Sequence, residues 1–310
     1  MHRPLFVLII ALAVFAVASA GLSGKVEPFY TWYCCFAWWP AILATQAAVK
    51  LKGGRSTLFD DPRLFATLLP LSLTFWLVFE AFNFRLDNWS YLNLPQALPW
   101  RWLGYVLSFS SVLPALTTAA DLLEHTGLFA KSRVRPLVRP DGLRPMLLSA
   151  GTACLALPLI APTLFFPLVW GGFVFLLEPW LHKNGGDSLL TDLESGRPRR
   201  PLLLMTSGLL CGFFWELWNF RAGARWVYDI PLPAGPRIFE MPLMGFLGFP
   251  AFALECFCLT SAFFILRRRI SVLPPATRRL AWAALILGAI AFDVWVMRGI
   301  DLWTVATVAG

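Results

Sequence analysis

Long apolar runs separated by short polar segments dominate the chain. A membrane-spanning helix needs about 20 mostly apolar residues, and runs of that length recur along the sequence. The run from 145 to 177 is too long for one span, and Pro158, Pro162 and Pro167 inside it favour a break into two helices. The pattern predicts about nine transmembrane helices, at Pro4–Leu22, Pro28–Val49, Leu64–Phe84, Trp102–Ala120, two within 145–181, Leu202–Phe220, Met241–Leu266 and Leu280–Met297.

Composition supports an all-α, polytopic membrane bundle. Of the 310 residues, 58% are hydrophobic and only 14% are charged, whereas a soluble domain has about 25% charged residues. The six cysteines lie inside apolar runs, where small buried hydrophobes are expected, and none has zinc-site spacing. The three histidines are scattered through the terminus and the loops. The sequence therefore predicts no metal site and no cofactor.

Four basic clusters mark the orientation of the chain in the membrane. They lie in the loops at 50–63, 131–144, 183–200 and 267–279. With nine spans and a cytoplasmic N-terminus, all four face the cytoplasm, as the positive-inside rule requires. We therefore expect a multi-pass protein of the bacterial inner membrane with an external C-terminus. The first run, with Arg3 before it and Ala18-Ser19-Ala20 at its end, also resembles a cleaved signal peptide.

Two stretches of the chain nearly repeat each other. The segment Glu80-Ala81-Phe82-Asn83-Phe84-Arg85, followed by Trp89 and Tyr91, resembles Glu216-Leu217-Trp218-Asn219-Phe220-Arg221, followed by Trp226 and Tyr228. The offset is 136 for the glutamates (216 − 80) and 137 for the tryptophans (226 − 89). Such a small drift indicates an internal duplication.

The duplication also covers a loop that precedes each motif. Segment 53–60 (GGRSTLFD) resembles segment 185–192 (GGDSLLTD), at an offset of 132 (185 − 53). Turn and helix-cap chemistry explains these loops better than a phosphate cradle, because neither has the Walker spacing. Four helices per copy would leave both copies in the same orientation. We predict two parallel four-helix repeats, 1–125 and 126–270, and an additional C-terminal helix in 271–310.

Charged groups at the end of a membrane helix are costly unless they pair or line a cavity. Within each motif the glutamate and asparagine are three residues apart and share a helix face. One interpretation is structural, with each arginine turning back to a glutamate and ion pairs locking the halves together. The other is an outward-facing pocket with aromatic walls. Its candidate catalytic acids are Glu216, Glu80, Glu240 and Glu255, and its candidate substrate-binding residues are Asn83, Arg85, Trp89, Tyr91, Trp215, Trp218, Asn219, Arg221, Trp226 and Tyr228.

These motifs resemble the integral-membrane lycopene cyclases of bacteria and fungi, which carry a small helical domain in two copies. Trp215-Glu216 fits the family's Trp–acid pair, and Trp226-Val227-Tyr228 fits its aromatic loop. The Pro-led stretch that starts at Pro242 has matching flanks, but Met244 and Gly245 stand where the family has paired glutamates. The chain also resembles uncharacterised bacterial membrane proteins with a Phe-Glu-Met-Pro-Leu stretch.

The resemblance implies binding or acid-catalysed cyclisation of an apolar polyene, an isoprenoid or carotenoid, by an isomerase-like enzyme. A small-solute or lipid transporter is an alternative, because duplicated helical units with intramembrane acids also build carriers. A structural or assembly protein without catalysis is another. The expected partners are membrane lipid or an apolar small molecule. No compact basic domain for nucleic acid is present, and a homo-oligomer is compatible with the sequence.

Overall fold

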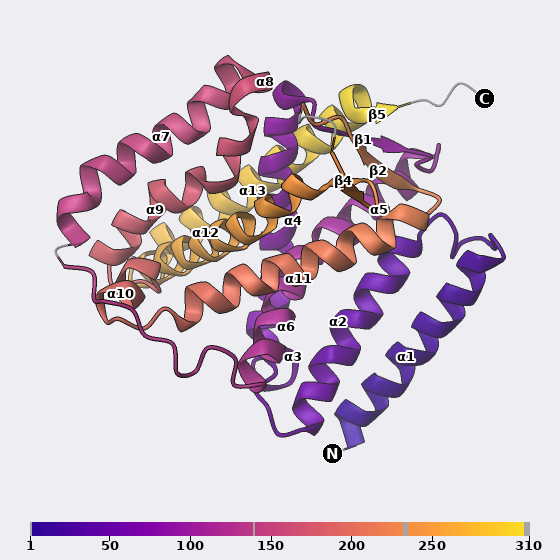
Figure 1. Ribbon diagram of the computed structural model, residues 1–310, viewed down its shortest axis with the longest axis horizontal. Coiled ribbons are helices and arrows are strands. Elements are labelled where there is room, and N and C mark those ends of the chain that lie inside the picture. The colour runs from indigo at the N-terminus through magenta and orange to yellow at the C-terminus, as the bar shows by residue number, and fades with distance from the viewer. Residues whose placement is uncertain (1, 139, 232–234, 307–310) are drawn as a thin grey trace. The chain divides into compact units, whose positions relative to one another are not determined.

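The computed structural model describes residues 2–138, 140–231 and 235–306. Among these residues nine helical segments are long and apolar enough to cross a membrane, which confirms the prediction of an all-α, multi-pass membrane protein. Figure 1 shows the elements. In chain order they are α1 (His2–Ser23), α2 (Tyr33–Leu51), α3 (Thr57–Asp60), α4 (Pro62–Leu86), β1 (Trp89–Leu92), α5 (Leu98–Phe109), α6 (Val112–His125), η1 (Pro140–Leu143), α7 (Arg144–Ile160), α8 (Pro162–Phe165), η2 (Phe166–Gly171), α9 (Gly172–Lys183), α10 (Leu189–Glu194), α11 (Arg199–Arg221), β2 (Arg225–Tyr228), β3 (Arg237–Ile238), β4 (Met241–Pro242), η3 (Leu243–Leu247), α12 (Gly248–Ser271), α13 (Pro275–Gly299), η4 (Ile300–Thr304) and β5 (Val305–Ala306).

Local sequence explains where the helices begin and end. Asp61 accepts a hydrogen bond from the backbone nitrogen of Leu64, and Pro62 opens α4 at a position that needs no backbone donor. Asp87 ends α4 in the left-handed region, with φ of 52°. The long apolar run breaks as the prolines predict, because Pro162 opens α8 and Pro167 lies in η2, between α7 and α9.

The chain forms two compact units. The first contains residues 1–128, 209–247 and 296–310, and the second contains 129–208 and 248–295. The division cuts through α11 and α13, so the units differ from the repeat boundaries expected from the sequence. The order of elements nevertheless recurs. Long helices α1 and α2, short α3, long α4 and strand β1 match α7, α9, α10, α11 and β2. The repeat boundaries and the parallel orientation of the copies remain predictions.

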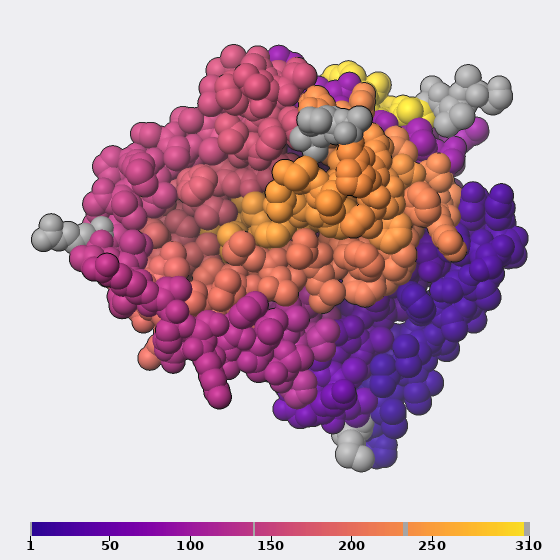
Figure 2. All heavy atoms as spheres, viewed as in Figure 1, coloured from indigo at the N-terminus to yellow at the C-terminus, as the bar shows by residue number. Residues whose placement is uncertain are grey.

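Small residues let helices of the second unit approach each other. A side chain at Gly151 on α7 would lie 2.6 Å from the backbone nitrogen of Leu176 on α9. A side chain at Gly208 would lie 2.3 Å from the carbonyl oxygen of Phe249 on α12. Close backbone approach at small residues is how membrane helices pack without a hydrophobic driving force. In the first unit α1 packs against α2, and much of α1, indigo in Figure 2, is exposed.

Short strands follow the two helices that carry the repeated motif, because β1 comes after α4 and β2 after α11. Strand β1 pairs antiparallel with β2 and parallel with β5, and β3 pairs with β4. The five strands found among the described residues all belong to the first unit. The pairing of β1 with β2 brings the two copies of the repeated motif side by side in that unit.

Candidate functional site

The two repeated glutamates are fully buried in the first compact unit. Glu80 lies near the end of α4, and Glu216 lies near the end of α11. In the described part of the chain neither carboxyl makes a salt bridge. Arg85 and Arg221 are both exposed. The ion-pair interpretation is therefore wrong in this detail, because the arginines stay at the helix ends while the glutamates turn to neutral donors.

Glu80 accepts hydrogen bonds from three aromatic side chains. The indole nitrogen of Trp76, one helical turn earlier, donates to Oε1 at 2.7 Å. The indole nitrogen of Trp89 reaches Oε1 at 3.1 Å and Oε2 at 3.3 Å. The hydroxyl of Tyr91 also donates to Oε1. Both oxygens of this buried carboxyl therefore have donors, as a satisfied structural carboxylate requires.

Glu216 has fewer donors than its counterpart. The Tyr228 hydroxyl donates to Oε1 at 2.6 Å, and the Trp226 indole donates to that hydroxyl at 2.8 Å. Oε2 is buried and has no hydrogen-bond partner among the described residues. The offset of 136 places Gly212 where the first copy has Trp76, so the second copy lacks that donor. Both oxygens of Glu80 thus accept hydrogen bonds, whereas Glu216 has one oxygen, Oε2, without a hydrogen-bond partner among the described residues.

The two repeated asparagines hold backbone, not a ligand. The Asn83 amide donates to the carbonyl oxygen of Trp89 at 2.8 Å and accepts from the backbone nitrogen of Asn88 at 2.8 Å. The Asn219 amide does the same with both backbone groups of Trp226, at 2.8 and 2.9 Å. Each asparagine ties the end of its helix to the strand that follows. The predicted substrate-binding role of these two residues receives no support from this geometry.

The register of the strands gives the twin motifs a local two-fold relation. Trp89 pairs with Tyr228, Ser90 with Val227, and Tyr91 with Trp226. Each tryptophan therefore lies opposite the tyrosine of the other copy. Because side chains alternate along a strand, these four aromatic residues share one face of the pair. Both glutamates bond to tyrosines on that face, so the two copies converge.

The tyrosine hydroxyls remain neutral donors. Burial first, and then the carboxyl of Glu80, raise the pKa of Tyr91 well above its ordinary value. Burial and the carboxyl of Glu216 do the same to the pKa of Tyr228, and Glu80 adds to that rise from the other copy. A hydroxyl whose anion is disfavoured by burial and by a nearby acid keeps its proton. Each tyrosine can therefore orient its carboxyl over a wide range of pH.

Indole rings connect the two motifs. Trp76 of the first copy lies 5.0 Å from Trp215 of the second, between ring centroids. Trp215 lies 5.7 Å from Trp226, and Trp38 on α2 lies 4.8 Å from Trp218. Trp38 is absent from the sequence-based candidates, since nothing in an apolar helix sets it apart from other membrane tryptophans. These rings form a continuous aromatic wall in the first unit.

The other two candidate acids are less closely tied to the pair. Glu240 is half-buried in the turn before β4 and interacts electrostatically with Glu216. Glu255 is fully buried on α12, in the second compact unit. The structure therefore brings Glu80, Glu216 and Glu240 together within the first unit. Glu255 lies in the second unit, where it accepts a hydrogen bond from the backbone nitrogen of Phe173.

A half-buried acid of the first unit escaped sequence reasoning. Asp301, in the π-helical turn η4, accepts hydrogen bonds from Arg101 at 3.2 Å, Trp102 at 2.8 Å and Tyr105 at 2.9 Å. Tyr105 in turn lies 6.4 Å from Tyr91, between ring centroids. The donors lie about 200 residues before the acceptor, at a separation for which the sequence offers no signal. Asp301 therefore fixes the turn η4 beside the candidate site.

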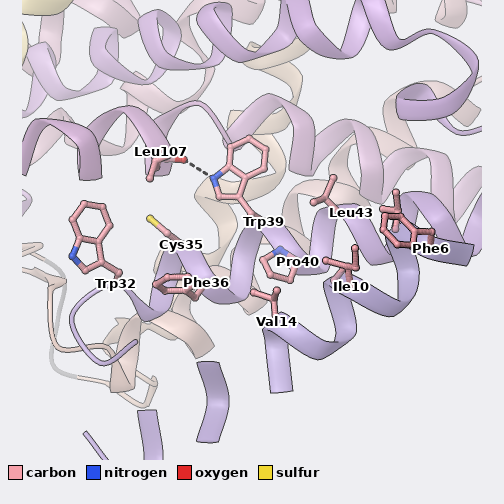
Figure 3. A pocket seen from close by; sticks show the side chains of 12 residues that line it. Phe6, Ile10, Val14, Trp32, Cys35, Phe36, Trp39, Pro40, Leu43 and Leu107 are labelled. Atoms are coloured by element: carbon pink, nitrogen blue, oxygen red, sulfur yellow. Dashed lines mark hydrogen bonds between the residues drawn. The ribbon is translucent and has the colours of Figure 1, made fainter. Parts of the chain in front are cut away.

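An apolar groove opens between α1, α2 and α5 in the same unit. Its volume is about 390 Å³, within the range of roughly 300–1,000 Å³ that is usual for small-molecule sites. Figure 3 shows side chains of α1 facing those of α2 across it. The polar atoms at its edge are already used, since the Trp39 indole donates to the Leu107 carbonyl oxygen at 3.0 Å and Cys35 bonds to Ser108 at 3.2 Å. The groove is lined by Phe6, Val7, Ile10, Ala11, Val14, Trp32, Cys35, Phe36, Trp39, Pro40, Leu43 and Leu107.

Comparison with known proteins gives no independent guide to this site. No family model, no curated protein and no solved structure matches the chain.

Proposed function

We propose that the protein binds a long apolar molecule of the isoprenoid or carotenoid class in its first compact unit, with Glu216 as the acid of the site. The proposal places the protein in the bacterial inner membrane, with a cytoplasmic N-terminus and an external C-terminus, because the four basic loops then share the inner face. The chemistry would be an isomerisation, which needs neither a cofactor nor a second substrate.

The bare oxygen of Glu216 is the observation that carries the proposal. Glu216 Oε1 is held by Tyr228, whereas Oε2 is buried and unpartnered. An unpaired buried carboxylate costs much more free energy than its neutral acid. A protonated Oε2 would be a donor without an acceptor, which is the arrangement that proton transfer to an alkene requires. Glu80, with its three donors, would stabilise the fold instead.

The reaction can be written so that its atoms balance. The O–H of Glu216 breaks as its proton adds to a carbon–carbon double bond, which leaves a carbocation on the chain. A neighbouring double bond attacks that cation and closes a ring. Loss of a proton from the ring to the Glu216 carboxylate restores the acid, so the product is an isomer of the substrate. The faces of Trp215, Trp218 and Trp226 would stabilise the cation through the ring quadrupole.

The groove supports the choice of an apolar substrate. Its described lining is carbon-rich, and its polar edge atoms bond to one another. Helix α2 is shared by the groove and the aromatic wall, since Trp39 lines the groove and Trp38 contacts Trp218. A hydrocarbon chain in the groove would therefore lie against the helix that also borders the acid.

The direct test is expression in cells that accumulate lycopene or other acyclic polyenes, followed by chromatography of the pigments. We expect cyclised products from the wild type and their loss in Glu216→Gln. Glu80→Gln is the matched control, because it removes the equivalent carboxyl that already has three donors, and its product yield per folded protein should stay within a few-fold of the wild type. Folded protein is quantified by size-exclusion chromatography.

Two results would reject the proposal. Unchanged pigments together with no copurifying lipid would remove the substrate class. Equal loss in both variants, at equal amounts of folded protein, would remove the special role of Glu216. Solute flux in proteoliposomes, without any change in lipids, would instead support the transporter alternative.

A further inference from the structure

A second polar cluster lies inside the first compact unit, at the other end of the helices. The Gln46 amide donates to Thr118 at 3.0 Å and to Asp121 at 2.9 Å. Its oxygen accepts from the Ser56 hydroxyl and from the backbone nitrogen of Leu58. Donors and acceptors match throughout, so this cluster joins α2, α3 and α6 as a satisfied network.

The second compact unit repeats this cluster, with a glutamate in place of the glutamine. At the offset of 132, Gln46 becomes Glu178, Ser56 becomes Ser188 and Leu58 becomes Leu190. The contacts recur as well. Glu178 Oε2 accepts from the Ser188 hydroxyl at 2.8 Å and from the backbone nitrogen of Leu190 at 3.0 Å.

The helix that closes the cluster has also changed. At the offset of 137, Asp121 becomes Cys258 (258 − 121) and Thr118 becomes Glu255 (255 − 118). The Cys258 thiol donates to Glu178 Oε1 at 3.3 Å, which keeps the contact between the matched helices. The first copy therefore contains one acid, and the second contains two.

Glu255 is the group that this exchange leaves incompletely bonded. It is fully buried, and its Oε1 accepts from the backbone nitrogen of Phe173, in the first turn of α9, at 2.9 Å. Its Oε2 is buried and has no hydrogen-bond partner among the described residues. Neither Glu178 nor Glu255 makes a salt bridge in the described chain. Two interior carboxyls thus lie without a neutralising cation.

The groups that face Glu255 add no positive charge. The thiols of Cys154 on α7 and Cys258 on α12 interact electrostatically with Glu255, and Cys258 in turn donates to Glu178 on α9. The segment η2, which packs on α12, has no titratable residue. From α11, Arg200 lies over the Phe257 ring, but its charge is paired with two aspartates, Asp187 and Asp192.

We propose that Glu255 is an exchangeable proton-binding site inside the second compact unit. The proton resides on Oε2, while Oε1 continues to accept from the α9 backbone. A neutral carboxyl removes the free-energy cost of an unpaired buried charge. The first copy needs no such proton, because Thr118 stands in the place of Glu255 and the Gln46 amide donates both to Thr118 and to Asp121. This proposal is independent of the isoprenoid site.

Infrared spectroscopy of the full-length protein in lipid bilayers tests it directly. The difference spectrum of wild type minus Glu255→Gln should contain the carbonyl stretch of one protonated carboxyl. That band should shift in D2O, and raising the pH should replace it reversibly by the carboxylate stretch. Glu178→Gln, which installs the residue of the first copy, is the matched control and should retain the Glu255 band.

Folding and outcome are checked together. Circular dichroism and size-exclusion chromatography establish that each variant is folded. If Glu255→Gln does not fold, Glu255→Asp keeps the acid and moves its band, which identifies the residue equally well. A carboxylate stretch at neutral pH in place of the protonated band would overturn the proposal. A band insensitive to both D2O and pH would do so too, because it would mean a proton that does not exchange.

Discussion

The asparagines that tie the repeated helices to their strands offer the sharpest test of the fold. Asn83→Ala removes the partners of the Trp89 carbonyl oxygen and the Asn88 nitrogen, which are buried. A buried backbone group left without a partner costs roughly 1–3 kcal/mol. We expect Asn83→Ala to lower the free energy of unfolding by roughly 2–5 kcal/mol. Asn219→Ala, at partly buried Trp226, should cost roughly 1–4 kcal/mol.

The two effects should not add. Both asparagines hold strands that pair with each other, so releasing one strand weakens what the second amide holds. The double variant is therefore expected to lose less than the sum of the single losses. Unfolding in mixed micelles of increasing SDS fraction, followed by circular dichroism, measures all three values.

The control is Gln96→Ala, which removes an exposed amide close to the same strands and should change stability by less than about 0.5 kcal/mol. If Asn83→Ala and Asn219→Ala behave like this control, the amides do not hold the strands and the account of the site fails. Additive losses would show instead that the two copies are energetically separate.

Two further predictions concern the edges of the first unit. Asp301→Asn weakens a half-buried acceptor of three donors, Tyr105 among them, and should lower the free energy of unfolding by roughly 1–3 kcal/mol in the same SDS titration; no change would mean that the turn η4 is held by packing alone. Hydrogen bonds from Lys50 and the Ser56 backbone lower the pKa of Asp60, so its contribution to stability is present above the unfolded value and is lost as the pH falls through the folded one. Stability of the wild type should therefore decrease in acid more than that of Asp60→Asn, and parallel pH profiles would contradict this.

The helices were readable from the sequence because each one is encoded locally. Length, hydropathy and the placement of arginines and lysines determine a membrane span without reference to any other part of the chain. The twin motifs were readable as well, and the sequence correctly singled out Glu80 and Glu216 as related residues. The sequence could not show what the two acids contact. The first copy has Trp76 where the second has Gly212, and this difference matters only because the Trp76 indole donates to Glu80 while one oxygen of Glu216 has no donor.

The strands and the interior network were missed for a different reason. β1 and β2 are four residues each, and their partners lie more than 130 residues apart, so no local periodicity reveals them. Arginines at the helix ends suggested ion pairs, but both repeated glutamates accept hydrogen bonds from neutral aromatic donors instead. The offset of 132 already aligns Gln46 with Glu178 in the sequence. Only the structure shows that the two side chains accept equivalent hydrogen bonds, from the backbone nitrogens of Leu58 and Leu190.

The pairing of equivalent strands has a consequence for the history and the engineering of this protein. The pairing of β1 with β2 is centred on Ser90 and Val227, which are equivalent positions of the two copies, so each strand is self-complementary. One copy expressed alone would therefore associate with a second molecule of itself in an isologous dimer. Joining two such copies in one polypeptide frees them to diverge, since each mutation then alters one side of the interface. The loss of an indole at Gly212 is such a change, and a symmetric ancestor would have carried it on both sides or on neither.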